Sequence, residues 1–263
     1  SEFIKVSLIL CLAKYYHSVP IMDASKISKM IIPAIITLIP VGLVMIQPDL
    51  GTSIIILIGA ASIFWIVGIN YKYFIGAIAL ICISIPIGWQ YLHNYQKERV
   101  YTFFNPERDP LGNGYHIMQS KIALGSGGLS GKGYLEGTQS HLNFLPEMHT
   151  DFIFTMYGEE FGFLGTFVLL IIYLSIILVS FNLAMKSRSR FAKYLSCGLI
   201  FLFFSHVFIN IAMVMGLLPV VGVPLPLISY GGSSMLATMI SFGLIMNCYI
   251  NKETMLAKEA FID

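Results

Sequence analysis

The sequence predicts an all-α polytopic membrane protein with about seven transmembrane helices. Of its 263 residues, 56% are hydrophobic and only 11% are charged, and the mean hydropathy is +0.77. A soluble domain needs a more polar surface than this composition provides. The apolar residues also gather into runs close to the roughly 20 residues that cross a bilayer as a helix. We therefore expect a single integral membrane domain over residues 1–263.

Seven runs fit this description, and the first of them is short. They lie approximately at 3–16, 30–46, 52–69, 73–92, 152–181, 191–215 and 233–250. The chain opens on Ser1, and no basic flank, apolar stretch and cleavage site precede the first run, as a signal peptide would require. We interpret the chain as a fragment that lacks its N-terminal part.

Basic residues alternate between the connections and so predict the topology. They follow the first, third and fifth runs and occur in the C-terminal tail, which assigns those regions to the cytoplasm. The opposite side then holds residues 47–51, a large loop at 93–151 and the stretch 216–232. The large loop contains five basic groups and six acids, but long loops cross the membrane largely regardless of charge. With Ser1 outside, an odd number of helices must precede it if the intact N-terminus is cytoplasmic.

Net charge and cysteine usage exclude other classes. A net charge of +2 gives no indication of nucleic-acid binding. The cysteines Cys11, Cys82, Cys197 and Cys248 lie singly inside apolar runs, without the spacing of a metal site.

Two charged features lie near the ends of predicted helices. Glu2 and Lys5 stand three residues apart on one helical face, where an ion pair neutralises both. An interfacial pair near a helix end fits this spacing equally well. In the sequence QPDLG, Asp49 follows a proline and can cap the next helix by accepting its free amide hydrogens. Capping alone would explain this acid.

The large loop mixes aromatic, charged and glycine-rich elements, which favours a folded structure at the membrane surface. Residues 115–124 have the pattern of an amphipathic helix. The sequence GSGGLSGKG at 125–133 fails as a nucleotide-phosphate loop, because Ser126 and Gly133 occupy positions that need Gly and Ser or Thr. Its amides could still bind a diphosphate, but a mobile hinge is the favoured interpretation.

Asp151 is the acid for which we predict catalysis, because it lies where the polar loop re-enters the membrane, at the depth of a lipid headgroup. An N-cap or first-turn acid is the alternative. Glu159 and Glu160 follow inside an apolar run, where acids need polar partners or a water-filled cavity. His206 and Asn210, four residues apart, could supply those partners.

The stretch 215–234, MGLLPVVGVPLPLISYGGSS, contains three prolines and four glycines between two apolar runs. Such a stretch cannot continue as regular helix, and irregular backbone at membrane depth must be buried in protein or line a cavity. We expect a re-entrant or tightly packed outer segment at 216–232 that forms one wall of a site. A plain connecting turn is the alternative.

These segments resemble the SEDS family, the RodA, FtsW and SpoVE proteins. The resemblance is carried by residues 215–234 together with Asn210, by SEFIK, by QPDLGTS, by DPLGNGYHIMQSKIALGSGGLSGKG and by FLPEMHTDFIF. It covers essentially the whole chain. QPDLGT and GTQS are most similar to RodA. The family has ten spanning helices, so the resemblance implies that the first three are absent here, in agreement with the charge argument.

The resemblance implies a peptidoglycan glycosyltransferase of the bacterial cytoplasmic (inner) membrane. It would polymerise lipid II on the extracytoplasmic face during cell elongation and cell-shape maintenance. Asp151 matches the essential family acid and would act as a general base or hold a divalent cation, Mg²⁺ or Mn²⁺. No organic cofactor is expected. A class B penicillin-binding protein and the elongation machinery are the implied partners, and nucleic acid is not.

Further site residues follow from this mechanism. The leaving diphosphate calls for cations, for which the candidates are Arg99, Arg108, Lys121 and Lys132. Supporting roles fall to Glu2, Lys5, Asp49, Glu147, His149, Glu160, Ser229 and Tyr230.

Two other functions fit the same helices. A lipid II flippase would also have intramembrane acids and a broken helix. An inactive truncated remnant that acts only as a scaffold is the second.

Overall fold

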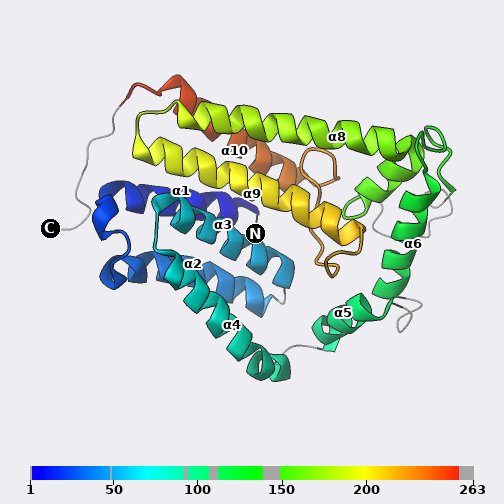
Figure 1. Ribbon diagram of the computed structural model, residues 1–263, viewed down its shortest axis with the longest axis horizontal. Helices are drawn as coiled ribbons and strands as arrows, with labels where there is room; N and C mark the ends of the chain where they lie inside the picture. The colour runs from blue at the N-terminus through cyan, green and yellow to red at the C-terminus, as the bar shows by residue number, and fades with distance from the viewer. Residues whose placement is uncertain (1, 48, 92–93, 107–111, 139–148, 255–263) are drawn as a thin grey trace. The chain divides into compact units, whose positions relative to one another are not determined.

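The computed structural model describes residues 2–47, 49–91, 94–106, 112–138 and 149–254, and within these ranges every regular element is a helix (Figure 1). The elements are α1 (Glu2–Ser18), the short 3-10 helix η1 (Ile21–Asp23), α2 (Ile27–Ile46), α3 (Leu50–Val67), α4 (Tyr71–Tyr91), α5 (Asn94–Phe104), α6 (Asn113–Ser126), α8 (Ile153–Met185), α9 (Arg190–Val214) and α10 (Gly232–Ile250).

Each of the seven apolar runs coincides with one of the helices α1 to α4 and α8 to α10, so the all-α membrane fold is confirmed. Of the helices in the described ranges, α2, α3, α8, α9 and α10 are long and apolar enough to cross a membrane. Helix α1 has 17 residues, and the apolar part of α4 is confined to Tyr71–Pro86. The apolar runs thus locate the seven predicted membrane helices, and five of these reach a full spanning length in the described residues.

The chain forms two compact units, and each is described by itself. The first consists of residues 1–75, 175–205 and 232–263, and the second of 76–174 and 206–231. Their boundaries fall inside α4, α8 and α9, so these helices contribute to both units.

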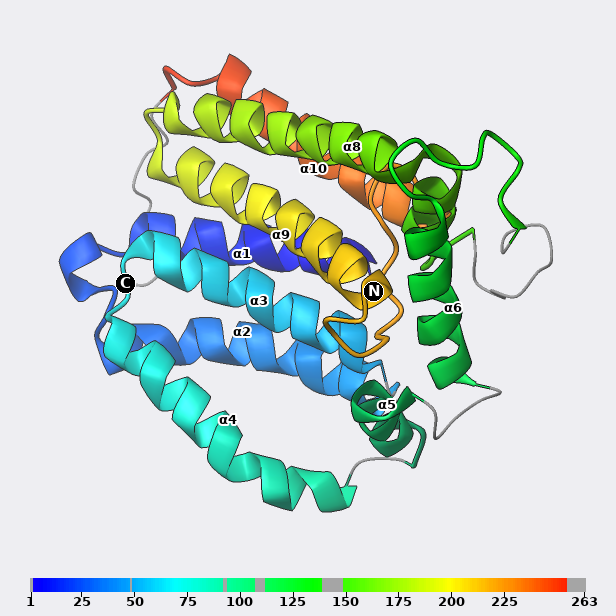
Figure 2. The same cartoon turned by 45° about the vertical axis from the view of Figure 1, so that its right-hand side comes forward.

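The first unit is built around α1, which packs against α2, α3 and α10 (Figure 2). Ile9, Leu12 and Ile63 are fully buried in its core. A Cβ atom at Gly198 of α9 would lie only 2.5 Å from the Ile63 side chain. Because even one methyl group does not fit there, this glycine lets α9 approach α1 and α3 closely.

In the second unit, α8 breaks at Gly162, where φ is 65° and ψ is −163°. In an unbroken helix, the amides of Phe163 and Leu164 would bond to the carbonyls of Glu159 and Glu160, four residues earlier. Residues 128–133 replace both of these bonds.

The replacement uses four hydrogen bonds of ordinary length. The amides of Phe163 and Leu164 donate to the carbonyls of Gly128 (2.9 Å) and Leu129 (3.0 Å). The carbonyls of Glu159 and Glu160 accept from the amides of Lys132 and Gly133, each at 3.1 Å. The glycine-rich segment therefore satisfies the backbone of the kink, as is required where water is absent.

This geometry corrects both sequence interpretations of 125–133. A Cβ atom at Gly131, whose φ is +80°, would lie 2.0 Å from the Glu160 carbonyl oxygen. The segment is therefore packed against α8 and is not a hinge. The amides of Gly131, Lys132 and Gly133 bond to chain carbonyls, so they are not free to bind a diphosphate.

Candidate functional site

Asp151 lies in the turn that leads into α8, two residues before the helix begins at Ile153. Three successive carbonyl oxygens in this turn each accept a hydrogen bond. His149 accepts from the amide of Tyr230 (2.9 Å), Thr150 from the hydroxyl of Ser229 (2.6 Å), and Asp151 from the side-chain amide of Asn210 (2.8 Å). The backbone that carries Asp151 is thereby fixed at three consecutive points.

Asn210 on α9 links this turn to the irregular segment that follows the helix. It is fully buried, and its Nδ2 atom donates to the carbonyls of Asp151 (2.8 Å) and Val223 (2.7 Å). The sequence offers Asn210 as one of two candidate partners for Glu159 and Glu160, but both of its amide hydrogens serve backbone carbonyls.

The segment between α9 and α10 is folded upon itself. The Ser229 hydroxyl accepts from the amide of Leu225 (2.7 Å) while donating to Thr150. Tyr173 on α8 donates to the carbonyl of Pro226 (2.6 Å). Val223 and Leu225 are buried, which means that apolar packing and hydrogen bonds hold this segment together.

The Asp151 carboxylate faces this segment. The side chain is half-buried, and its Oδ2 atom lies 3.4 Å from the position that a Cβ atom on Gly222 would take. Gly222 has φ of +71°, a conformation that only glycine adopts without strain. Because α8 has no acidic residue in its first turn, Asp151 is not a first-turn acid of this helix, and the N-cap alternative stays a prediction.

Helix α6 is fastened to α8 and α9 by buried hydroxyls. Ser120 donates to the carbonyl of Val214 (2.9 Å) and lies 2.7 Å from the Thr155 hydroxyl. Since the single hydroxyl hydrogen of Ser120 goes to Val214, Thr155 is the donor in the second bond. Sequence reasoning predicted the helix at 115–124 but missed these two residues, because a lone Ser or Thr in an apolar helix carries no distinctive pattern.

Lys121, on the same helix, lies across the end of α9. A Cβ atom at Gly216 would meet the Cε and Nζ atoms of Lys121 at 2.2 and 2.6 Å. The ammonium group therefore stands beside the last turn of α9, where a cation is stabilised by the helix dipole.

Lys132 has a buried partner. Its ammonium group lies 2.7 Å from Glu159 and 2.8 Å from the Thr138 hydroxyl, which in turn donates to Glu159 at 3.2 Å. Glu159 is 1% exposed and Lys132 is 27% exposed. The glycine-rich segment brings this lysine to the acid, and this partner was not predicted from the sequence, where the candidate partners lay on α9.

The other predicted site residues are spread over both units. In the second unit, Arg99 is half-buried on α5, Glu160 is buried, and Tyr230 exposes its side chain while its amide fixes His149. Arg108 and Glu147 lie outside the described residues.

The remaining predicted residues belong to the first unit. Lys5, which is 2% exposed, forms the expected ion pair with Glu2 at 2.6 Å. Asp49 is the N-cap of α3 and accepts from the Thr52 amide at 3.0 Å. Both local predictions are confirmed, and both contacts stabilise helix starts.

A divalent cation would find few protein ligands here. In the part of the chain that the structure describes, no group of three or more His, Cys, Asp or Glu side chains could hold a metal ion. The half-buried Asp151 carboxylate fits only a cation that takes most of its ligands from water and substrate phosphates, as Mg²⁺ commonly does.

Within the described residues, the fold and this site define an all-helical multi-pass membrane protein with a half-buried carboxylate in the turn that leads into a long helix. Residues 1–254 match the family model FTSW_RODA_SPOVE, described as "Cell cycle protein". The chain belongs to this family, and it is a multi-pass protein of the bacterial inner membrane.

Named relatives agree with this assignment. The chain is 44% identical over 251 residues to "Peptidoglycan glycosyltransferase MrdB" of Escherichia coli K12, and the alignment covers 92% of this chain and 68% of the relative. It is 42% identical over 210 residues to the protein of that name from Helicobacter pylori, covering 80% of this chain and 54% of the relative.

Solved structures show the same fold. A chain from "Structural coordination of polymerization and crosslinking by a peptidoglycan synthase complex" matches with a TM-score of 0.79 at 30% identity, over 95% of this chain and 69% of that chain. The Thermus thermophilus rod shape determining protein RodA matches with a TM-score of 0.65 at 25% identity, over 96% of this chain and 66% of that chain.

Proposed function

We propose that this chain is a peptidoglycan glycosyltransferase that polymerises lipid II on the extracytoplasmic face of the membrane, with Asp151 as its general base. The observation that supports this role most directly is the fixing of three successive carbonyls at 149–151, beside a carboxylate that remains half-exposed. A general base must be held within hydrogen-bond reach of the proton it removes. A turn held at the reacting residue and at the two residues before it provides such positioning.

The reaction uses one proton transfer and one displacement. The Asp151 carboxylate accepts the proton of the acceptor sugar's 4-hydroxyl as that oxygen forms a bond to the anomeric carbon of the donor. The bond between this carbon and the diphosphate oxygen breaks, and the undecaprenyl diphosphate leaves with the bonding electron pair. The acid that results on Asp151 returns its proton to water.

Among the predicted cations, Lys121 is the better placed to receive the leaving diphosphate. It is exposed, and its ammonium group lies 2.6 Å from the position that a Cβ atom on Gly216 would take, at the start of the segment that borders Asp151. Lys132 is instead neutralised by the buried Glu159 at 2.7 Å. A cation already paired with a carboxylate contributes less to the binding of a new anion.

A divalent cation, where present, would be held by Asp151 together with the substrate diphosphate, and would neutralise charge on that leaving group. The protein partner in this proposal is a class B penicillin-binding protein, which crosslinks the product. The resemblance to RodA and the fold shared with a chain of a peptidoglycan synthase complex support it.

The test is polymerisation of fluorescent lipid II by purified protein, assayed together with its partner. We expect the wild type to yield glycan polymer and Asp151→Asn to yield none while keeping the same melting temperature. Asparagine has the same shape and cannot accept the proton at neutral pH. Polymerisation by Asp151→Asn at the wild-type rate would refute the catalytic role.

The same preparation distinguishes the alternatives. Lipid II that crosses proteoliposome membranes without polymer formation would indicate a flippase. A chain that folds and binds its partner without either activity would indicate a scaffold.

A further inference from the structure

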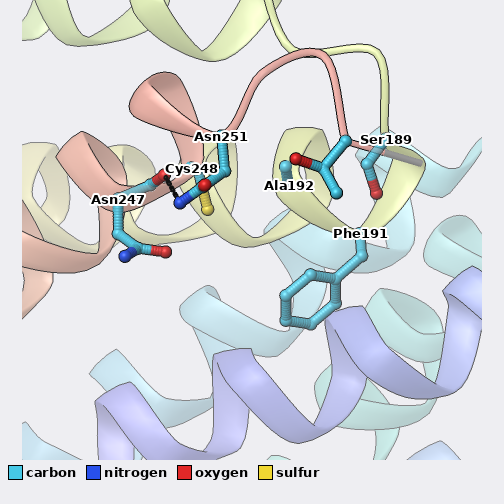
Figure 3. Close-up of a pocket in the computed structure, with 7 residues that line it drawn as sticks. Ser189, Phe191, Ala192, Asn247, Cys248 and Asn251 are labelled. Atoms are coloured by element: carbon cyan, nitrogen blue, oxygen red, sulfur yellow. Dashed lines mark hydrogen bonds between the residues drawn. The ribbon is translucent and has the colours of Figure 1, made fainter. Parts of the chain in front are cut away.

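Outside the proposed catalytic site, the first unit contains a pocket of about 270 Å³ between the start of α9 and the end of α10. Figure 3 shows Ser189, Phe191 and Ala192 on one side and Asn247, Cys248 and Asn251 on the other. Pockets for drug-sized ligands measure roughly 300–1,000 Å³, so this one suits a smaller group.

One wall of this pocket is a helix start that lacks its usual cap. The first amides of a helix have no partner within the helix, and a serine at the N-cap normally accepts from one of them. Ser189 occupies the position before α9, is only 7% exposed, and its Oγ atom makes no hydrogen bond within the described residues. A buried hydroxyl without a partner costs free energy, unless a ligand supplies one.

The surrounding charge is strongly positive. The segments that border the pocket carry five basic residues and a single acid, namely Lys186, Arg188, Arg190, Lys193, Lys252 and Glu253. The start of a 25-residue helix adds its own partial positive charge. An anion is therefore the ligand that this pocket favours.

The two walls are fastened to each other without a ligand. Ser187 donates to the carbonyl of Cys248 (3.3 Å), and the Arg188 amide donates to the carbonyl of Lys252 (2.9 Å). The Arg188 guanidinium also pairs with Glu253 at 3.0 Å. Because these contacts already fix the pocket, little ordering is required when a ligand binds.

We propose that this pocket binds the phosphate group of an anionic membrane lipid. Both walls are ends of helices long and apolar enough to cross a membrane, which places the pocket at the level of lipid headgroups. The excess of Lys and Arg assigns this end to the cytoplasmic side, whose leaflet attracts basic segments through its anionic lipids. The phosphate would accept from the Ser189 hydroxyl and the first amides of α9, and Phe191 would contact the glycerol.

The test places a fixed negative charge where the phosphate would lie. In Ser189→Asp the carboxylate can cap α9 itself, so the variant should fold as well as the wild type. Asn251→Asp puts the same charge on the opposite wall at an exposed position, so the result does not depend on one variant. The control is Asn70→Asp, an exposed site before α4 whose Oδ1 atom accepts from the Lys72 amide, as a carboxylate also would.

The full chain is placed in nanodiscs of phosphatidylcholine, with or without phosphatidylglycerol, and retained lipid is counted by native mass spectrometry. We expect the wild type and Asn70→Asp to retain phosphatidylglycerol and to melt at a higher temperature with it. Both pocket variants should bind it at least about tenfold more weakly, because juxtaposed like charges are costly. Equal retention by all four proteins would refute the site, and equal protection by inorganic phosphate would refute a lipid as its ligand.

Discussion

Gly222 offers a sharp test of the site, because its substitution acts on the Asp151 carboxylate without removing it. In Gly222→Ala the new Cβ atom would lie 3.4 Å from Asp151 Oδ2. This is van der Waals contact, so the methyl group need not move the carboxylate. It would instead occupy the space through which water or a hydroxyl group reaches that oxygen, and a general base needs its proton donor within roughly 2.6–3.2 Å.

The same substitution also strains the backbone, and that effect needs its own control. A left-handed conformation costs an ordinary residue roughly 1–2 kcal/mol. Gly222 has φ of +71°, and Gly68, which ends α3, has φ of +88° with no atom within 4 Å of its Cβ position. Gly68→Ala therefore carries a similar strain with no contact to a carboxylate.

The assay is lipid II polymerisation by both variants, with melting temperatures measured in the same detergent. We expect similar losses of stability, about 1–2 kcal/mol each, and a loss of activity for Gly222→Ala alone. A misplaced reacting group lowers the rate of an enzyme on the order of 100-fold. We therefore expect the polymerisation rate to fall by between about tenfold and about 100-fold. If Gly222→Ala polymerises as fast as Gly68→Ala, the Oδ2 side of Asp151 is not where the acceptor hydroxyl binds.

Three further substitutions test the supports of this site. Asn210→Ala removes a donor from the buried carbonyl of Val223, at roughly 1–3 kcal/mol, and from the partly buried carbonyl of Asp151. It should lower both the melting temperature and the activity. An unchanged rate would show that the turn at Asp151 needs no such support. Gly131→Ala should prevent stable folding, because its Cβ atom would lie 2.0 Å from a carbonyl oxygen. The control is Gly128→Ala, where φ is +55° and the space is open, so the free energy of unfolding should fall by only about 1 kcal/mol. Equal melting temperatures of the two variants would contradict the packing described at the kink. Lys132→Met leaves Glu159 buried without its cation and should lower the free energy of unfolding by about 3 kcal/mol, the low end for such pairs because Lys132 is partly exposed. Adding Glu159→Gln to this variant should restore part of the lost stability. Additive effects of the two substitutions would argue against the pair.

The helices could be predicted because their signal is local. Every apolar run became a helix, and the ion pair of Glu2 with Lys5 and the cap at Asp49 involve residues only three positions apart. Contacts at such spacing are fixed by helix geometry alone. Local reasoning was sufficient for them.

The arrangement around Asp151 could be predicted only in part. Its position between a polar loop and an apolar run is visible in the sequence, whereas its fastening depends on Asn210 and Ser229, which lie 59 and 79 residues away from their partners. The same limit explains why Lys132 was missed as a partner of Glu159, since this lysine lies on another segment. The kink at Gly162 was missed because the glycines in YGEEFGFLG do not themselves show which peptide is broken.

The hydrogen bonds exchanged at Gly162 have a mechanical consequence. Lifting residues 128–133 away would leave four main-chain groups of α8 unsatisfied in apolar surroundings, at several kcal/mol each. Residues 128–133 and the first turns of α8 therefore have to move as a unit. Any protein that binds residues 128–133 and displaces them would also displace the short part of α8 that follows Asp151.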